Sequence, residues 1–156
     1  MFVSIIMGST SDFDVVRPAV LLLKEFGVEV DVKVLSAHRT PKELVDYVES
    51  VSDKVDVFIT AAGLAAALPG VVAAHTLKPV IGLPVKAGAL QGVDALLSIV
   101  QMPPGVPVAT VGIGRAKNAA LLAIEIMALK YPELEEKLRE YRQSQREKVL
   151  NAEVNL

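Results

Sequence analysis

Two short polar segments carry the side chains that could do chemistry in this chain. Residues 8–12 read Gly-Ser-Thr-Ser-Asp, and residues 36–41 read Ser-Ala-His-Arg-Thr-Pro. Hydroxyls and backbone N–H groups at the start of a helix can hold a phosphate. An arginine presents a fork of donors to the same anion, and a histidine changes its charge near neutral pH. Together the two segments predict a site for a phosphate-bearing ligand with one proton-transferring group.

The first segment also has a plainer interpretation. Ser11 or Asp12 could cap a helix, with Asp14 as the capping-box partner of Ser11. The segment is not a Walker loop, because it lacks Gly-Lys-Ser/Thr. A carboxylate would repel a phosphate, so in a functional site we expect Asp12 to accept hydrogen bonds from sugar hydroxyls, beside the hydroxyls of Ser9 and Ser11.

The second segment is harder to explain as a structural turn. It puts Ser36, His38 and Arg39 within one short loop, where functional residues tend to lie. Thr40 and Pro41 are expected to be the N-cap and the first residue of the helix that follows. His75, by contrast, is expected on a helix surface or in a partly buried position outside the site.

Residues 61–70 read Ala-Ala-Gly-Leu-Ala-Ala-Ala-Leu-Pro-Gly. Small side chains let a backbone approach a ligand closely and form an apolar wall, although close packing of a helix on a sheet explains the same composition. Gly112 and Gly114 are followed by Lys117 where a dinucleotide motif has its third glycine, so NAD binding is not indicated. No metal-ligand spacing and no Ser/His/Asp triad is evident, and we expect neither a metal nor an organic cofactor.

Composition narrows the function classes. The 156 residues include 16 Lys and Arg against 18 Asp and Glu, with 4% aromatic residues and no Trp, which disfavours nucleic-acid binding. The chain is 52% hydrophobic, enough for a real core, and has no Cys. The absence of Cys excludes disulfides, Cys-ligated metals and a thiolate nucleophile, and it makes the cytoplasm the expected location.

Two uncharged stretches, residues 57–77 and 95–114, are long enough to imitate membrane spans. Both are interrupted by Gly and Pro, which would leave unsatisfied backbone groups in lipid. We interpret them as buried strands joined to loops and helices, and we expect no membrane association. No basic flank precedes the first apolar run, so a signal peptide is not indicated.

Strands and helices alternate along the sequence. Apolar runs predict strands at residues 2–7, 28–35, 55–60, 79–83 and 106–111, the second with a polar side or at a sheet edge. Helical patterns are expected from the first polar turn to about residue 26, then at 41–50, 66–75, 92–100 and 115–131. Pro18 requires the first helix to begin late or to bend. This order predicts an α/β, three-layer, flavodoxin-like or Rossmann-like domain with a five-stranded parallel sheet.

We expect residues 1–156 to form a single domain, with a core over 1–131 and a C-terminal helix over 132–150. That helix carries Leu134, Leu138 and Tyr141 on a narrow apolar stripe, so it is expected to dock on a neighbouring subunit. In an open parallel sheet the ligand crevice lies at the carboxyl ends of the strands. The polar segments and the Ala-Gly segment all follow strands, so they should meet at that edge.

Five motifs together resemble the N5-carboxyaminoimidazole ribonucleotide mutase family, carboxylase-type enzymes of de novo purine synthesis. They occupy residues 7–12, 36–41, 62–66, 68–70 and 101–110, and the resemblance covers roughly residues 3–130. It implies conversion of N5-carboxyaminoimidazole ribonucleotide into 4-carboxy-5-aminoimidazole ribonucleotide without ATP, metal or organic cofactor, with CO2 as a trapped intermediate. It also implies a flavodoxin-like homo-octamer.

Matching positions imply the roles of single residues. Ser9, Arg39 and Ser36 would hold the phosphate, Asp12 the ribose hydroxyls, and His38 would carry the proton as acid and then as base. The remaining substrate contacts implied by the resemblance are Ser11, Ala37, Ala62, Gly63 and Leu68. The apolar wall would favour recapture of CO2 by excluding water.

One position departs from the resemblance. The family usually reads Ala-Ala-His-Leu-Pro-Gly where this chain has Ala67 in place of the histidine. A related branch that carboxylates aminoimidazole ribonucleotide directly with CO2 has Ala there, but it typically has Lys at the place of Arg39 and lacks Leu-Pro-Gly. Direct carboxylation is therefore one alternative. A non-catalytic nucleotide- or flavin-binding module and an inactive scaffold subunit are others.

Overall fold

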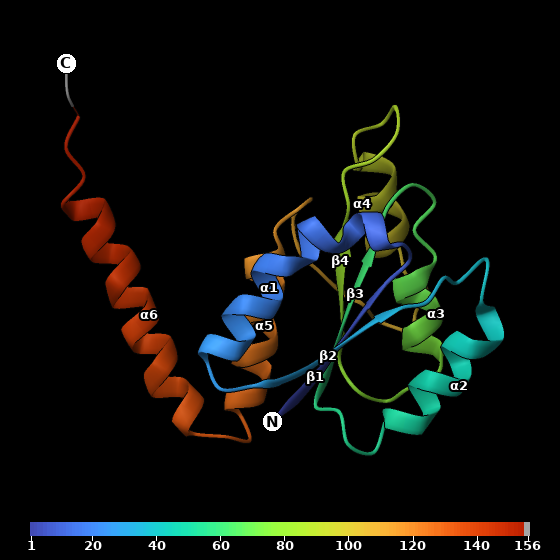
Figure 1. The fold of residues 1–156 in the computed structure, drawn as a ribbon, viewed down its shortest axis with the longest axis horizontal. Coiled ribbons are helices and arrows are strands. Elements are labelled where there is room, and N and C mark those ends of the chain that lie inside the picture. Colours follow the sequence, from blue (N-terminus) through green and yellow to red (C-terminus); the bar gives the residue numbers. More distant parts are fainter. Residues whose placement is uncertain (155–156) are drawn as a thin grey trace.

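A computed structural model, which describes residues 1–154, contains a parallel five-stranded sheet with the strand order β2-β1-β3-β4-β5 (Figure 1). The strands are β1 (Phe2–Met7), β2 (Glu29–Val34), β3 (Val57–Ala62), β4 (Val80–Pro84) and β5 (Ala109–Thr110). Strand β1 is the run before Gly8, apolar except for Ser4, with the bounds expected from the sequence. The flavodoxin-like α/β fold expected from the sequence is confirmed.

Helices cover both faces of this sheet. They are the 3-10 helix η1 (Thr10–Asp12), α1 (Phe13–Glu25), α2 (Pro41–Val51), α3 (Leu68–Ala74), α4 (Val93–Val100), α5 (Ala116–Ala128) and α6 (Glu133–Leu150). Neighbouring strand residues alternate between two apolar clusters: Ile5 packs toward α1 and α5, and Ile6 toward α2, α3 and α4. Figure 1 shows the resulting layers, with α1 and α5 on one side of the strands and α2 and α3 on the other.

The two edge strands differ in how well the sequence predicted them. Strand β2 alternates apolar and charged residues and lies at an edge, as expected. The fifth strand was expected over 106–111, but β5 contains only Ala109 and Thr110. Pro107 lies within the expected range, and proline has no N–H to donate to a ladder, so pairing begins only after it.

The boundaries of two other elements shift for reasons of packing. Strand β3 was expected over 55–60 but runs to Ala62, and α3 begins at Leu68 instead of about residue 66. Ala61 and Ala62 favour helices as isolated residues, but both are buried between neighbouring strands. Helix α1 includes Pro18 and begins before it at Phe13, directly after η1, so the late start that the proline suggested is wrong.

Gly82 allows a close contact that fixes the position of α4. It lies in the middle of β4, and a Cβ atom placed there would clash with the Ile99 side chain on α4. A glycine is therefore required for α4 to approach the sheet at this point.

Helix α6 is attached through its first half, so the apolar stripe of Leu134, Leu138 and Tyr141, expected to dock on a neighbouring subunit, packs instead on the core of its own chain. Leu134 and Leu138 are buried, Lys137 Nζ donates to the Phe26 carbonyl at 2.8 Å, and the ring centroids of Tyr141 and Phe26 are 5.9 Å apart. The rest of the helix projects away from α1 and α5 (Figure 1). Within residues 1–154, no helix is both long and apolar enough to span a bilayer.

Asp56 joins three parts of the chain at the amino edge of the sheet. Its carboxylate accepts hydrogen bonds from Phe2 N at 2.9 Å, Lys130 Nζ at 3.0 Å and Tyr131 Oη at 3.1 Å. Partial burial alone would raise the pKa of Asp56, but these hydrogen bonds and the charge of Lys130 outweigh it and lower the pKa below its usual 3.8. The cluster ties β1 to the segment between α5 and α6.

We expect Asp56→Asn to lower the free energy of unfolding at pH 7 by about 1.5–3 kcal/mol, the range for hydrogen bonds to a charged group. Since the folded pKa lies below the ordinary value, this stabilisation is present above the ordinary pKa and disappears as the pH falls through the folded value. Urea denaturation of both proteins at pH 7 and at about pH 3 measures the difference and its loss.

Asp46→Asn provides the matched control. Within residues 1–154, Asp46 pairs only with Lys42, one turn before it on α2, and both side chains are largely exposed. Exposed pairs of this kind contribute little, so the control should unfold like the wild type. Equal stability of Asp56→Asn and the wild type at pH 7 would contradict the role given to the cluster.

Candidate active site

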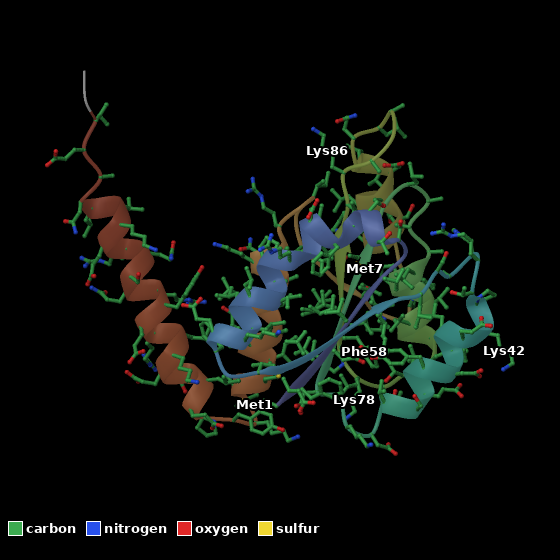
Figure 2. The ribbon with its side chains drawn as sticks, in the orientation of Figure 1. Met1, Met7, Lys42, Phe58, Lys78 and Lys86 are labelled. Atoms are coloured by element: carbon green, nitrogen blue, oxygen red, sulfur yellow. The ribbon has the colours of Figure 1, made fainter. Side chains whose placement is uncertain are left out.

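The polar segments meet at the carboxyl edge of the sheet, as expected. In Figure 2, Met7 and Lys86, which lie at the carboxyl ends of β1 and β4, are in the upper part of the view, whereas Met1 and Lys78 lie below. A cavity of about 530 Å³ opens there. It is lined by Gly8, Ser9, Ser11, Asp12, Ser36, Ala37, His38, Arg39, Ala62, Gly63, Leu64, Ala65, Ala66, Ala67, Leu68 and Ala87. Every candidate site residue named from the sequence therefore lines one cavity.

The turn after β1 is organised by Ser9. Its Oγ accepts hydrogen bonds from Ser11 N at 3.3 Å and from Ser11 Oγ at 2.9 Å, so Ser9 caps the short helix η1. The expectation that Ser11 or Asp12 would be the capping side chain is wrong. Asp12 occupies the N-cap position of α1, but its side chain makes no capping hydrogen bond.

The Asp12 carboxylate is consequently available to a ligand. Burial raises the pKa of Asp12 above its usual 3.8, and this effect exceeds the opposing hydrogen bonds from Ser9 and Ser11 and the charge of Arg39. A carboxylate that has lost water without gaining enough donors gains from additional hydrogen-bond donors. Sugar hydroxyls are donors of this kind.

Arg39 connects the turn after β2 to the turn after β1. Its Nη2 donates to the Gly8 carbonyl at 2.6 Å, and its Nε donates to Ser36 Oγ at 3.3 Å. The bond to Gly8 joins loops that follow adjacent strands, since β1 pairs with β2, and the bond to Ser36 lies within the loop after β2. A guanidinium has five N–H donors, so these two contacts leave others for an anion.

His38 lies between Ala37 and Arg39 and lines the same cavity, with its side chain exposed at the rim. Among the hydrogen bonds of residues 1–154, none involves its imidazole ring. Neither ring nitrogen is therefore committed to a neighbouring group, as a proton-transferring residue requires.

The opposite wall of the cavity is apolar and tightly turned. Leu64 adopts a left-handed φ of +56°, which is uncommon for a residue with a side chain, and Ala66 N donates to the Leu64 carbonyl at 2.8 Å. A second turn follows, in which Ala67 N donates to the Ala65 carbonyl at 2.8 Å. These turns carry the chain from β3 into α3 and leave methyl groups facing the cavity.

Sequence reasoning missed one part of this wall. Ala87, in the loop between β4 and α4, lines the cavity, and its Cβ would lie 3.2 Å from a Cβ added at Gly63. The loop has no reactive side chain at this point, so only its place after the carboxyl end of β4 could have indicated it.

Other residues considered from the sequence lie outside the cavity. His75 follows α3 at the amino edge of the sheet, with its Nδ1 3.6 Å from Glu49 Oε1, which agrees with its expected place outside the site. Gly112, Gly114 and Lys117 do not line the cavity. In the part of the chain that the structure describes, no group of three or more His, Asp or Glu side chains is arranged to hold a metal ion.

Comparison with known proteins agrees with this geometry. Residues 2–148 match the family model described as AIR carboxylase. The chain is 61% identical over 147 residues to the N5-carboxyaminoimidazole ribonucleotide mutase of Methanocaldococcus jannaschii, covering 94% of this chain and 92% of that protein. It is 58% identical over 142 residues to the Pyrococcus abyssi mutase, covering 90% and 82%.

A solved structure extends the similarity to three dimensions. The crystal structure of Treponema denticola PurE superposes with a TM-score of 0.88 at 32% sequence identity, covering 96% of this chain and 94% of that one. Sequence and structure thus agree over almost the whole length, and the chain belongs to the AIR carboxylase family.

Proposed function

We propose that this protein converts N5-carboxyaminoimidazole ribonucleotide into 4-carboxy-5-aminoimidazole ribonucleotide, a step of purine biosynthesis. The observation that carries the proposal is that the His38 imidazole and the Arg39 guanidinium share one cavity with an apolar wall, in a chain of the AIR carboxylase family. Relatives at 50–61% identity have the name of the mutase, which favours isomerisation over direct carboxylation.

In this proposal the polar residues of the cavity bind the phosphate and the ribose, and its apolar residues contact the rest of the substrate. Ser9 and Arg39, with Ser36, hold the phosphate, and Asp12 accepts hydrogen bonds from the ribose hydroxyls. The aminoimidazole ring of the substrate then lies against the apolar wall. The remaining contacts come from Ser11, Ala37, Ala62, Gly63 and Leu68, which line the same cavity.

His38 carries one proton through two steps. The imidazolium protonates the carbamate nitrogen as its N–C bond breaks, which releases CO2 and leaves the amine and a neutral imidazole. The ring carbon C4, made nucleophilic by that amine, forms a C–C bond to CO2. The neutral imidazole then removes the C4 proton, so His38 ends the cycle as the imidazolium with which it began.

The apolar wall acts between the release of CO2 and the formation of the new C–C bond. CO2 has to stay beside C4 until the new bond forms, and an ordered site makes that second step effectively intramolecular. Ala62, Ala66 and Leu68 line the cavity, are almost fully buried and have hydrocarbon side chains. Excluding water from this wall favours recapture over escape.

Assembly and location belong to the same proposal. We expect residues 1–156 to act as one domain within a cytoplasmic homo-octamer, in which α6 docks on a neighbouring subunit. Val149 and Leu150, near the end of α6, are 76% and 65% exposed. Helix α4 also presents Val93, Leu97 and Val100 on an exposed face. Apolar surface of this kind is typical of subunit contacts.

The substrate test follows from the proposal. We expect purified protein to convert N5-carboxyaminoimidazole ribonucleotide rapidly at low bicarbonate, because the transferred CO2 arrives with the substrate. Aminoimidazole ribonucleotide with the same low bicarbonate should react much more slowly. The absorbance of the 4-carboxy product measures both reactions. Equal or faster use of aminoimidazole ribonucleotide would instead favour direct carboxylation, and a flavin-loaded, inactive preparation would favour a binding module.

His38→Asn should lower kcat by about 10²–10⁴-fold, the usual contribution of a general acid–base, because an amide cannot take up the proton. KM should change far less, since the phosphate contacts remain. Steady-state kinetics separates the two parameters. His75→Asn is the matched control, because His75 lies near Glu49 outside the cavity, and it should keep wild-type kinetics. Undiminished turnover in His38→Asn would remove the imidazole from the mechanism.

Arg39→Ala should chiefly raise KM, by about ten- to a hundredfold, because charged hydrogen bonds to a phosphate contribute about 1.5–3 kcal/mol. Arg39→Lys should lie in between, since it keeps the charge but loses the fork of donors. Lys42→Ala removes a nearby exposed cation that pairs with Asp46, and it should leave KM unchanged. A loss of kcat alone in Arg39→Ala would contradict the division of roles.

A further inference from the structure

Thr40 closes the loop that carries His38 and Arg39. Its Oγ1 accepts a hydrogen bond from Ser36 N at 2.8 Å and donates one to the Ser36 carbonyl at 3.2 Å. The Thr40 amide donates to the same carbonyl at 2.9 Å. One side chain therefore satisfies both backbone groups of Ser36 and holds the two ends of the loop together.

This use of the hydroxyl differs from the helix cap expected from the sequence. Thr40 does occupy the N-cap position of α2, and Leu44 N donates to its carbonyl at 3.0 Å. Its side chain, however, makes no capping hydrogen bond. The hydroxyl turns back to the loop instead of forward to the helix, so its removal takes nothing from the first turn of α2.

Ser36, fixed in this way, orients the arginine. Ser36 Oγ accepts hydrogen bonds from Arg39 N at 3.2 Å and from Arg39 Nε at 3.3 Å. Arg39 then reaches the Gly8 carbonyl. Contacts run without a gap from Thr40 to Ser36, from Ser36 to Arg39 and from Arg39 to the turn after β1.

We propose that Thr40 is a positioning residue, whose hydroxyl sets the placement of His38 and Arg39 through Ser36. Thr40 does not line the 530 Å³ cavity, whereas Ala37, His38 and Arg39 do. It lines an adjoining cavity of about 340 Å³ together with Ser36 and Arg39, and its hydroxyl is bonded to both backbone groups of Ser36. Residues 37–39 lie between Ser36 and Thr40, which the Thr40 hydroxyl joins. The inference rests on the proposed function for its kinetic consequences, but the order of the loop can be measured without any activity.

The chain offers a matched control for the loss of a threonine hydroxyl. Thr76 Oγ1 accepts hydrogen bonds from Lys78 N at 3.1 Å and Ser52 Oγ at 3.0 Å, in the loop that leads into β4 at the amino edge of the sheet. Thr76→Val and Thr40→Val each remove a hydroxyl that closes a loop, and the shape of the side chain is retained. Thr40→Ser keeps the hydroxyl at the test position and removes only a methyl group.

Thr40→Val leaves Ser36 N without its partner, so residues 37–39 lose their fixed arrangement. We expect kcat/KM to fall by tenfold or more, in line with the cost of small misplacements in active sites, with KM raised as well as kcat lowered. Thr40→Ser should restore both parameters to within about twofold of the wild type, and Thr76→Val should match the wild type. A loss of folded protein alone would lower the apparent kcat and leave KM unchanged.

Backbone and arginine side-chain ¹⁵N relaxation gives the second readout. In Thr40→Val, residues 37–39 and Arg39 Nε should become mobile on the nanosecond timescale, but not in Thr40→Ser or Thr76→Val. Wild-type kinetics together with an ordered loop in Thr40→Val would overturn the inference, as would a Thr40→Ser variant as impaired as Thr40→Val. If the wild type does not convert the proposed substrate, the proposed function fails, and the relaxation result alone decides the role of Thr40.

Discussion

The site depends on the parallel pairing of β1 with both of its neighbours. The register places Met7 opposite Val34 on one side and opposite Ala61 on the other, so the three strands end at nearly the same level. The serine turn, the His-Arg loop and the alanine-rich turn therefore begin side by side. Because the side-chain period of a strand is two residues, a slip by one residue would exchange the two apolar clusters and break this alignment.

The sequence predicted the parts of this arrangement that depend on apolar patterning. The run that ends at Gly8 defined β1, and the alternation of Val and charged residues identified β2 as an edge strand. Side-chain direction was less predictable. Nothing in the sequence indicates that the Thr40 hydroxyl turns toward Ser36, or that Ser9 instead of Asp12 forms the cap, because local φ and ψ decide both. Ala87 was missed because an alanine carries no chemical signal.

The capacity to bind an anion that we propose for this protein is a local property and not a property of its overall charge. The net charge is −2, so no long-range field attracts a phosphate. The capacity comes from one guanidinium held at the cavity by Ser36 and the Gly8 carbonyl, beside the hydroxyl groups of the turn after β1. Holding the arginine in advance reduces the side-chain entropy that a flexible cation would lose on binding.

Two aspartates at opposite edges of the sheet differ in how far hydrogen bonds compensate for their partial burial. Asp56, at the amino edge, receives donors from three directions, and its pKa lies below the ordinary value. Asp12, at the carboxyl edge, is partly buried with fewer donors, and its pKa lies above that value. The first carboxylate gains its stabilisation within the chain and holds the fold together. The second lacks part of that stabilisation, so additional hydrogen-bond donors would be favourable there, as the ribose contact that we propose for Asp12 requires.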